Sequence, residues 1–220
     1  MDRISGSPWR MVRYIVLGIP LLVLLWLLLA RLVRAVYKFP IPEFLANVID
    51  NPLRRRLQPP DATAVRHGLE PGMAVLEIGP GSGTYTIGAA RRVGPAGRVV
   101  AIDIEPKMVE RVVQRAAAEG ITNVDARVAN VFALPFADAS FDAAFMIFVI
   151  GEIPTPERAL REIRRVLKPG GTLACSEVLV DPDSPSAWTL ARWATAAGFG
   201  LQKKMGNVFY YTWLLENLGG

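Results

Sequence analysis

The chain has 220 residues, 51% of them hydrophobic, with 25 basic and 20 acidic side chains. This length accommodates one domain of ordinary size and an appendage, and a core of that size needs no disulfide or metal for support. Cys175 is the single cysteine and His67 the single histidine, so an intramolecular disulfide is excluded. For the same reason we expect no metal site and no Ser/His/Asp triad, and we place His67 at the surface.

Positive charge is concentrated at the N-terminus. Residues 1–60 hold nine basic against three acidic side chains, whereas residues 61–220 hold 16 basic and 17 acidic ones. The body of the chain therefore lacks the charge signature of a nucleic-acid binder, and we expect no nucleic-acid partner. Basic residues next to an apolar run point instead to a membrane surface.

An uncharged run, 14–30, contains eight Leu, two Ile and two Val. As a helix it would be about 26 Å long, near the lower limit for crossing a bilayer. We therefore expect a basic tail over 1–13, a transmembrane and juxtamembrane helix over 14–38, and a linker with short helices over 39–69. A cleavable signal peptide, a buried core helix and a monotopic anchor in one leaflet are the alternatives. The charge count favours a cytoplasmic position for the part that follows the span.

From residue 70 to residue 220, strand-like runs alternate with helical patterns. We expect strands at 74–78, 98–104, 124–130, 141–149 and 172–179, helices at 84–93, 106–119, 155–167 and 186–197, and a closing pair of strands within 201–216. Such alternation, with nearly continuous apolar strands, predicts a mostly parallel sheet with helices on both faces. In sheets of this kind, ligands bind at the carboxyl ends of the strands near the topological switch point.

A glycine-rich turn joins the first expected strand to the first expected helix. Gly79, Gly81 and Gly83 alternate with other residues, and Glu77 stands two positions before the first glycine. Such a turn lets a ligand approach the backbone closely at a helix N-terminus. The dinucleotide fingerprint G-x-G-x-x-G would need glycine at position 84, where this chain has Thr84.

Further motifs follow in order: V-V-A-I-D-I at 99–104, L-P-F-x-D-x-S-F-D at 134–142 and L-K-P-G-G at 167–171. With them, residues 70–215 resemble the class I S-adenosylmethionine-dependent methyltransferases. The resemblance implies an α/β fold, a Rossmann-like doubly wound and mostly parallel seven-stranded sheet with helices on both faces. It also implies that 70–220 is the methyltransferase domain, that 39–69 caps its active site, and that the cofactor is S-adenosyl-L-methionine.

The resemblance also assigns residues to the cofactor. The glycines would admit its methionine half, Glu77 would hold its ammonium group, and Asp103 would accept hydrogen bonds from the ribose hydroxyls. The full cofactor set is Glu77, Gly79, Pro80, Gly81, Gly83, Thr84, Asp103, Ile104, Met108, Asn130, Val131 and Phe148. Met108 is explained equally well as a core residue. Asn130 stands where the family often has an acid, and a neutral amide should bind the adenine amino group more weakly than a carboxylate.

The acceptor side carries fewer signals. Where many small-molecule relatives have a pair of histidines, this chain has Gly151 and Glu152, so Glu152 is the candidate proton acceptor, although a solvated loop acid is an equally good interpretation. Phe209, Tyr210 and Tyr211, with Trp188 and Trp193, would line an apolar acceptor pocket. A single cysteine does not fit arsenic methylation, which uses several thiols in related enzymes.

These features together predict a membrane-anchored methyltransferase, single-pass or monotopic, with its catalytic domain on the cytoplasmic face. Its partners would be the lipid bilayer and a lipophilic small-molecule acceptor such as a quinol, an isoprenoid or a lipid. Two alternatives stay open: a non-catalytic, membrane-tethered cofactor-binding or scaffold protein, and a methyltransferase that acts on a membrane protein. The sequence leaves the oligomeric state and the acceptor atom undetermined.

Overall fold

The computed structural model describes residues 52–179 and 181–219. Before them it describes only positions 14, 17–19, 21, 22, 25, 26, 28, 29, 32 and 33. The chain divides into two compact units, Met1–Phe39 and Pro40–Gly220. The described residues of the first unit are helical, and nearly all of their side chains are exposed.

The expected membrane-spanning helix requires a correction. Within the positions that the structure describes, no helix is both long and apolar enough to cross a membrane. This finding contradicts the transmembrane helix predicted over 14–38 and the membrane localisation that was built on it. The other positions of that range, together with the basic tail at 1–13 and residues 39–51 of the linker, lie outside the described residues.

The second unit is built on a seven-stranded sheet with the order β3-β2-β1-β4-β5-β7-β6. The first five strands are parallel and the last two are antiparallel to their neighbours. The strands are β1 (Ala74–Ile78), β2 (Arg98–Asp103), β3 (Val124–Val128), β4 (Phe141–Ile147), β5 (Leu167–Val178), β6 (Phe199–Gly206) and β7 (Tyr210–Asn217). The strand order reverses between β1 and β4, which is the switch point where such sheets bind ligands.

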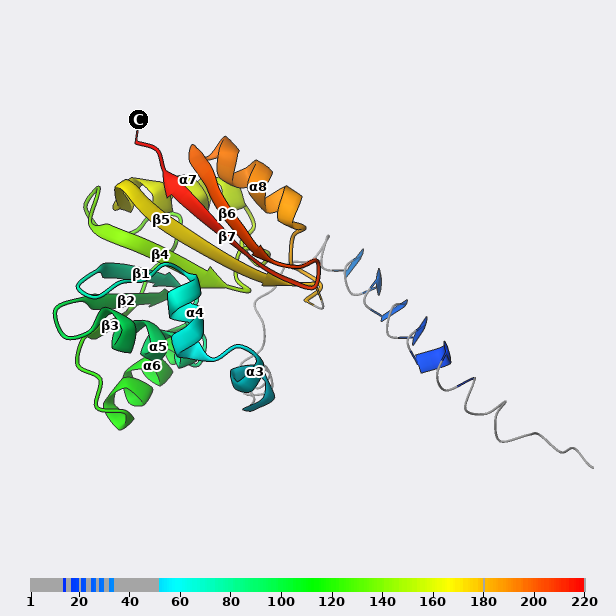
Figure 1. Cartoon of the computed structure of the whole chain (residues 1–220), viewed down its shortest axis with the longest axis horizontal. Helices are drawn as coiled ribbons and strands as arrows, with labels where there is room; N and C mark the ends of the chain where they lie inside the picture. Colours follow the sequence, from blue (N-terminus) through cyan, green and yellow to red (C-terminus); the bar gives the residue numbers. More distant parts are fainter. Residues whose placement is uncertain are drawn as a thin grey trace, which may run out of the picture. The chain divides into compact units, whose positions relative to one another are not determined.

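Helices cover both faces of this sheet (Figure 1). The helices are α3 (Pro52–Leu57), α4 (Pro60–Arg66), α5 (Thr84–Val93), α6 (Pro106–Ala118), α7 (Pro156–Val166) and α8 (Ala187–Ala196). Buried residues of α4 and α5 share one core cluster with Val75, Val99 and Phe145. The alternate residues of the same strands share the other cluster with α7 and α8. This alternation follows from the two-residue period of a strand, and it confirms the doubly wound sheet.

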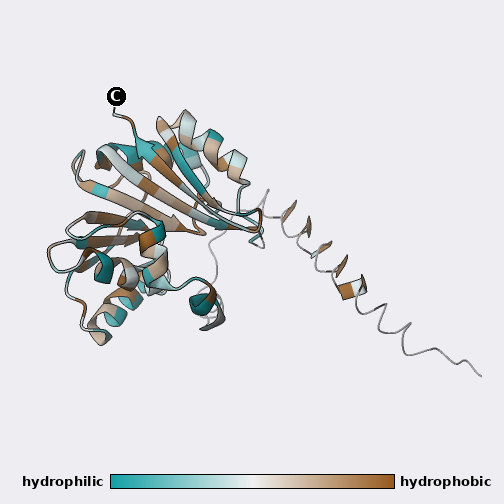
Figure 2. Ribbon diagram, viewed as in Figure 1, coloured by the Kyte–Doolittle hydropathy of each residue, from teal (hydrophilic) through white to brown (hydrophobic). Residues whose placement is uncertain are grey.

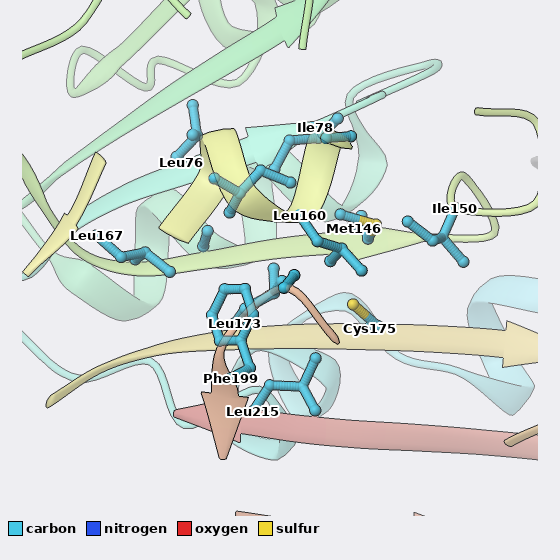
Figure 3. Packing of buried hydrophobic residues seen from close by; sticks show 14 of the residues in the cluster. Leu76, Ile78, Met146, Ile150, Leu160, Leu167, Leu173, Cys175, Phe199 and Leu215 are labelled. Atoms are coloured by element: carbon cyan, nitrogen blue, oxygen red, sulfur yellow. The ribbon is translucent and has the colours of Figure 1, made fainter. Parts of the chain in front are cut away.

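The larger core cluster lies beneath α7. Leu160 and Ile163 of this helix are fully buried and belong to the same cluster as Leu76, Met146 and Leu173 of three neighbouring strands. Figure 3 shows Leu160 directed toward these strand residues. In Figure 2, β1 and β2 are mostly in the hydrophobic colours, whereas β6 and β7 are mixed. Because α7 and the strands share this core, the carboxyl ends of β1 and β4 are held in a fixed relation to each other.

The sequence locates most elements to within two residues, but it misplaces the beginning of β5. Lys168-Pro169-Gly170-Gly171 was expected to be a turn, whereas β5 already begins at Leu167. The pairing with β4 jumps from Phe141↔Leu167 to Ala143↔Thr172, so the four residues form an irregularity inside the ladder. Glycine and proline in a strand are typical of such bulges.

Candidate functional site

The glycine loop, residues 79–83, lies at the carboxyl end of β1. The Gly79 N–H donates to the Ile102 carbonyl at 2.9 Å, which ties the loop to the end of β2. All three glycines of the loop have positive φ, a conformation that other residues rarely adopt. A Cβ at Gly79 would lie 2.6 Å from Cγ2 of Val149, so glycine also permits the close approach of the residues that follow β4. At Gly81 a Cβ would meet nothing within 4 Å.

The end of the loop is continuous with α5. The Gly83 N–H donates to the Pro80 carbonyl at 3.0 Å, and Gly83 precedes the first helical residue, Thr84. Thr84 is buried, and its hydroxyl accepts a hydrogen bond from Arg115 of α6. The loop is therefore held at both ends, and its middle is left open at a helix N-terminus, where backbone N–H groups favour negative charge.

Glu77 is a buried acid on β1, two residues before the loop. Only 3% of the residue is exposed, and its Oε2 has no hydrogen-bond partner among the described residues. Burial is the main cause that raises the pKa of Glu77 to about 8, and the Asp103 charge raises it further, while a hydrogen bond from Thr86 opposes the shift. A buried carboxylate oxygen without a partner is costly, and a cationic ligand would remove that cost.

Asp103 ends β2, next to β1 in the sheet. Burial raises its pKa, against a hydrogen bond that its Oδ1 accepts from the Glu105 N–H at 2.9 Å. The two other residues expected here differ in exposure: Ile104 is 69% exposed, whereas Met108 on α6 is 8% exposed. Thus Met108 has the burial of a core residue, and Ile104 offers an apolar surface beside Asp103.

Asn130 and Val131 follow β3 in a turn. The Asn130 side-chain oxygen accepts from the Phe132 N–H at 2.9 Å, and the residue is exposed. An amide oxygen has a second lone pair, so this bond leaves it able to accept once more. Val131 is half-buried and packs against the larger core cluster.

The segment after β4 carries Phe148 and Glu152. Phe148 has φ of +62°, and its N–H donates to the Ser176 carbonyl of β5 at 2.9 Å. A positive φ at a bulky residue costs of order 1–3 kcal/mol and is common at functional sites. Glu152 lies in the next turn, where its N–H donates to the Val149 carbonyl at 3.0 Å. The Glu152 charge also raises the pKa of the nearby Glu177.

The three aromatic residues expected at the acceptor side have different surroundings. Phe209 is 65% exposed, while Tyr211 is buried and donates its hydroxyl hydrogen to the Pro185 carbonyl at 2.7 Å. Tyr210 lines a cavity of about 100 Å³ with residues of the α3–α4 region: Leu57, Gln58, Pro59, Ala62, Thr63 and Arg66. Trp188 is 71% exposed and Trp193 packs against the core.

His67 is buried, contrary to its expected place at the surface. It follows α4 with 1% of its surface exposed, and its Nε2 lies 2.9 Å from the Ser176 hydroxyl, which in turn lies 2.8 Å from the Thr212 hydroxyl. Burial lowers the pKa of His67 to about 3, helped by the neighbouring Arg66 charge. This neutral histidine joins α4 to β5. A single histidine at this position gives no periodic pattern from which its burial could be predicted.

Sequence reasoning also missed Arg54, Tyr85 and Glu177. The Arg54 guanidinium lies over the rings of Phe148 and Tyr85, and the Tyr85 hydroxyl donates to the Gln58 carbonyl at 3.4 Å. Glu177 of β5 is 1% exposed, and burial raises its pKa to about 8. The signal available for Arg54 was the Arg54-Arg55-Arg56 run, which we used only in the charge count that favoured a cytoplasmic position.

Comparison with known proteins agrees with this geometry. Residues 76–175 match the family described as "Methyltransferase domain". The chain is 42% identical over 111 residues to "Ubiquinone/menaquinone biosynthesis C-methyltransferase UbiE" of Hydrogenovibrio crunogenus, covering 50% of this chain and 44% of that protein. It is 33% identical over 126 residues to "Arsenite methyltransferase" of Halobacterium salinarum, covering 53% and 32%. The chain thus spans about half or less of the length of these curated relatives.

A solved structure extends the similarity to a larger share of the chain. The structure of a SAM-dependent methyltransferase from Aquifex aeolicus matches with a TM-score of 0.75 at 25% identity, covering 80% of this chain and 99% of that one. The seven-stranded fold, the glycine loop at the switch point and these similarities define the class. Residues 76–175 thus lie in an S-adenosylmethionine-dependent methyltransferase domain, and the fold and this match imply S-adenosylmethionine as its cofactor.

Proposed function

We propose that the protein transfers a methyl group from S-adenosylmethionine to a lipophilic small-molecule acceptor, with a quinol as the favoured class. The observation that carries the proposal is the pairing of a glycine loop with two acids, Glu77 and Asp103, on adjacent strands at the switch point. The quinol follows from the similarity to the quinone-biosynthesis methyltransferase over half of the chain.

The residues at this edge have the chemistry that the cofactor requires. The unpartnered Oε2 of Glu77 would accept from its ammonium group, and Asp103 would accept from its ribose hydroxyls. Gly79, Gly81 and Gly83, with Pro80 and Thr84, would let its methionine half lie against the backbone. The remaining proposed contacts, at the adenine and beside the methyl group, are Ile104, Met108, Asn130, Val131 and Phe148.

When bound, the cofactor supplies a methyl group that its sulfonium already activates. The protein then has to hold the acceptor in line and exclude water, and it needs no covalent step of its own. Phe148 and Tyr210, whose ring centroids are 6.3 Å apart in an edge-to-face arrangement, would form the wall against which a flat acceptor lies. Glu152, one turn beyond Phe148, would take the proton that the methylated acceptor releases.

The test has two stages. The purified chain is titrated calorimetrically with S-adenosylmethionine and, separately, with a nicotinamide dinucleotide. We expect binding of the first alone. The protein is then incubated with a lipid extract, or with a detergent extract of membrane proteins, and a labelled methyl donor. Label in a quinol fraction would support the proposal. Cofactor binding without transfer to any acceptor would contradict it and favour a non-catalytic cofactor-binding protein, and label in protein alone would favour the protein methyltransferase.

A further inference from the structure

Two guanidinium groups lie over aromatic rings at the acceptor side of the site. Arg54 of α3 lies 4.5 Å from the ring centroid of Phe148 and 5.2 Å from that of Tyr85. Arg66 of α4 lies 5.2 Å from the ring centroid of Tyr210. Because Phe148 and Tyr210 also contact each other, one aromatic pair carries a positive charge at each end. Stacking on a ring holds a guanidinium in place and leaves its in-plane N–H groups directed outward.

The cavity that Arg66 and Tyr210 help to line has a positively charged lining. Its lining, given above, contains the Arg66 cation and the polar side chains of Gln58 and Thr63, but no acidic residue. Three other arginines of the domain form ion pairs: Arg91 with Glu119, Arg127 with Asp125, and Arg165 with Glu162 and Asp138. Among the described residues, no carboxylate forms an ion pair with Arg66. The cavity therefore combines an aromatic wall with an unneutralised donor of hydrogen bonds.

A ligand that satisfies both features is a flat ring bearing a negatively charged oxygen. The ring would lie against the apolar wall, and the oxygen would accept charge-assisted hydrogen bonds from a guanidinium, which are about twice as strong as neutral ones. We propose that the Arg66 cavity binds the anionic oxygen of a planar aromatic acceptor, with Arg54 as the second positive charge beside Phe148. This inference rests on the proposed function and names the ionisation state of its acceptor.

The arrangement also gives these arginines a chemical use. Positive charge beside a phenol-type oxygen favours its ionised form, and the ionised ring is the better nucleophile for an activated methyl group. A strong base is then not needed before methyl transfer. This agrees with the interior position of His67, whose Nε2 is engaged with Ser176, 2.9 Å away.

The test uses two probes that differ mainly in charge. 2-Hydroxy-1,4-naphthoquinone is an anion at neutral pH, and 2-methoxy-1,4-naphthoquinone is its neutral counterpart. Calorimetric titration of the full chain should show the anion binding about tenfold or more tightly, the size expected for one hydrogen bond to a charged group. Arg66→Met should abolish this preference, and Arg54→Met should reduce it. Arg192→Met is the matched control, because Arg192 lies at a similar distance, 5.3 Å, over Trp188 on α8, outside the cavity.

Two further measurements keep the inference testable if a variant is unstable. Arg66→Lys keeps the charge and should retain a preference for the anion, and added salt should weaken binding of the anion but not of the neutral probe. Equal binding of both probes to the native chain, or an unchanged preference in both Arg→Met variants, would overturn the inference. The same preparations are titrated with S-adenosylmethionine. If S-adenosylmethionine does not bind, the proposed function is contradicted, while the comparison of the two probes still tests the role of the two arginines.

Discussion

At the scale of single residues, the acid that ends β2 gives a direct test of the cofactor site. Asp103→Ala should weaken binding of S-adenosylmethionine by about 1–3 kcal/mol, because the ribose hydroxyls would lose their charged acceptor. Calorimetry measures the affinity. Asp125→Ala on the neighbouring strand β3 is the control, since Asp125 pairs only with the exposed Arg127 in the described structure. Equal affinities for the two variants would show that the ribose lies elsewhere.

The raised pKa of Glu77 predicts that a proton is released when the cofactor binds. Its pKa of about 8 keeps this buried carboxyl largely protonated at pH 7. An ammonium group against Oε2 would favour the ionised form of Glu77 over the protonated form. Cofactor binding should therefore release a proton and become tighter as the pH rises from 7 toward 8. Titrations in buffers of different ionisation enthalpy count the released protons. Glu77→Gln, which has no proton to lose, should show weaker binding with no such release. A native chain that binds without proton release would contradict this role.

At the scale of elements, α7 tests how the core positions the site. Leu160 has 0% of its surface exposed and lies within the cluster that joins α7 to β1, β4 and β5. Leu160→Ala should lower the free energy of unfolding by about 2–5 kcal/mol, because it removes buried methyl groups and leaves a cavity. Chemical denaturation measures the change. Arg161→Ala, at the next and exposed position, should change stability by less than about 0.5 kcal/mol. Similar losses for both would contradict the packing described.

The same scale shows which elements the sequence could predict. The strands β1, β2 and β4 were predicted because their apolar pattern agrees with their burial. The helices α6 and α7 were predicted because Pro106 and Pro156 mark their first residues. The beginning of β5 was missed because Pro169 and Gly170 are typical of turns. Their inclusion in a strand depends on the pairing of Leu167 and Thr172, on either side of them, with β4, and no local pattern contains this pairing. The burial of His67 was missed for a similar reason, since its partner Ser176 is 109 positions away.

Within the candidate site, the glycine loop and its acids could be predicted because they are contiguous or regularly spaced. The aromatic acceptor residues could not be separated by sequence: Phe209, Tyr210 and Tyr211 are adjacent, yet the first is exposed, the second lines the cavity and the third is buried. The exposure of each side chain depends on whether the residue lies in the β6–β7 connection or on β7, and this is a property of the sheet. The sequence analysis used Arg54 only in a charge count and did not single out Arg66, because the stacking joins residues that are far apart in the sequence.

At the scale of the whole molecule, the two buried acids should set how stability depends on pH. Burial raises the pKa values of both Glu77 and Glu177 to about 8, far above the value of 4.5 for an exposed glutamate. A group whose folded-state pKa is raised stabilises the fold below its unfolded pKa, and that contribution is lost as the pH rises through the folded pKa. Between about pH 4.5 and pH 8, each acid should therefore reduce stability by on the order of 1 kcal/mol per pH unit as the pH rises.

His67 acts in the opposite direction but in a lower range. Its folded-state pKa of about 3 lies below the ordinary value of 6.5, so its contribution to stability is lost only as the pH falls below about 6.5. The cofactor-free protein should accordingly be most stable in mildly acidic solution and weaken toward pH 8. Urea unfolding at several pH values measures this, and Glu177→Gln should remove part of the decline above pH 6.5. Glu157→Gln, which changes an exposed acid in the first turn of α7, is the control. A native stability that rises from pH 6.5 to 8 would mean that these carboxyls are ionised in the fold, and Glu77 would then need a permanent positive partner rather than one that arrives with the cofactor.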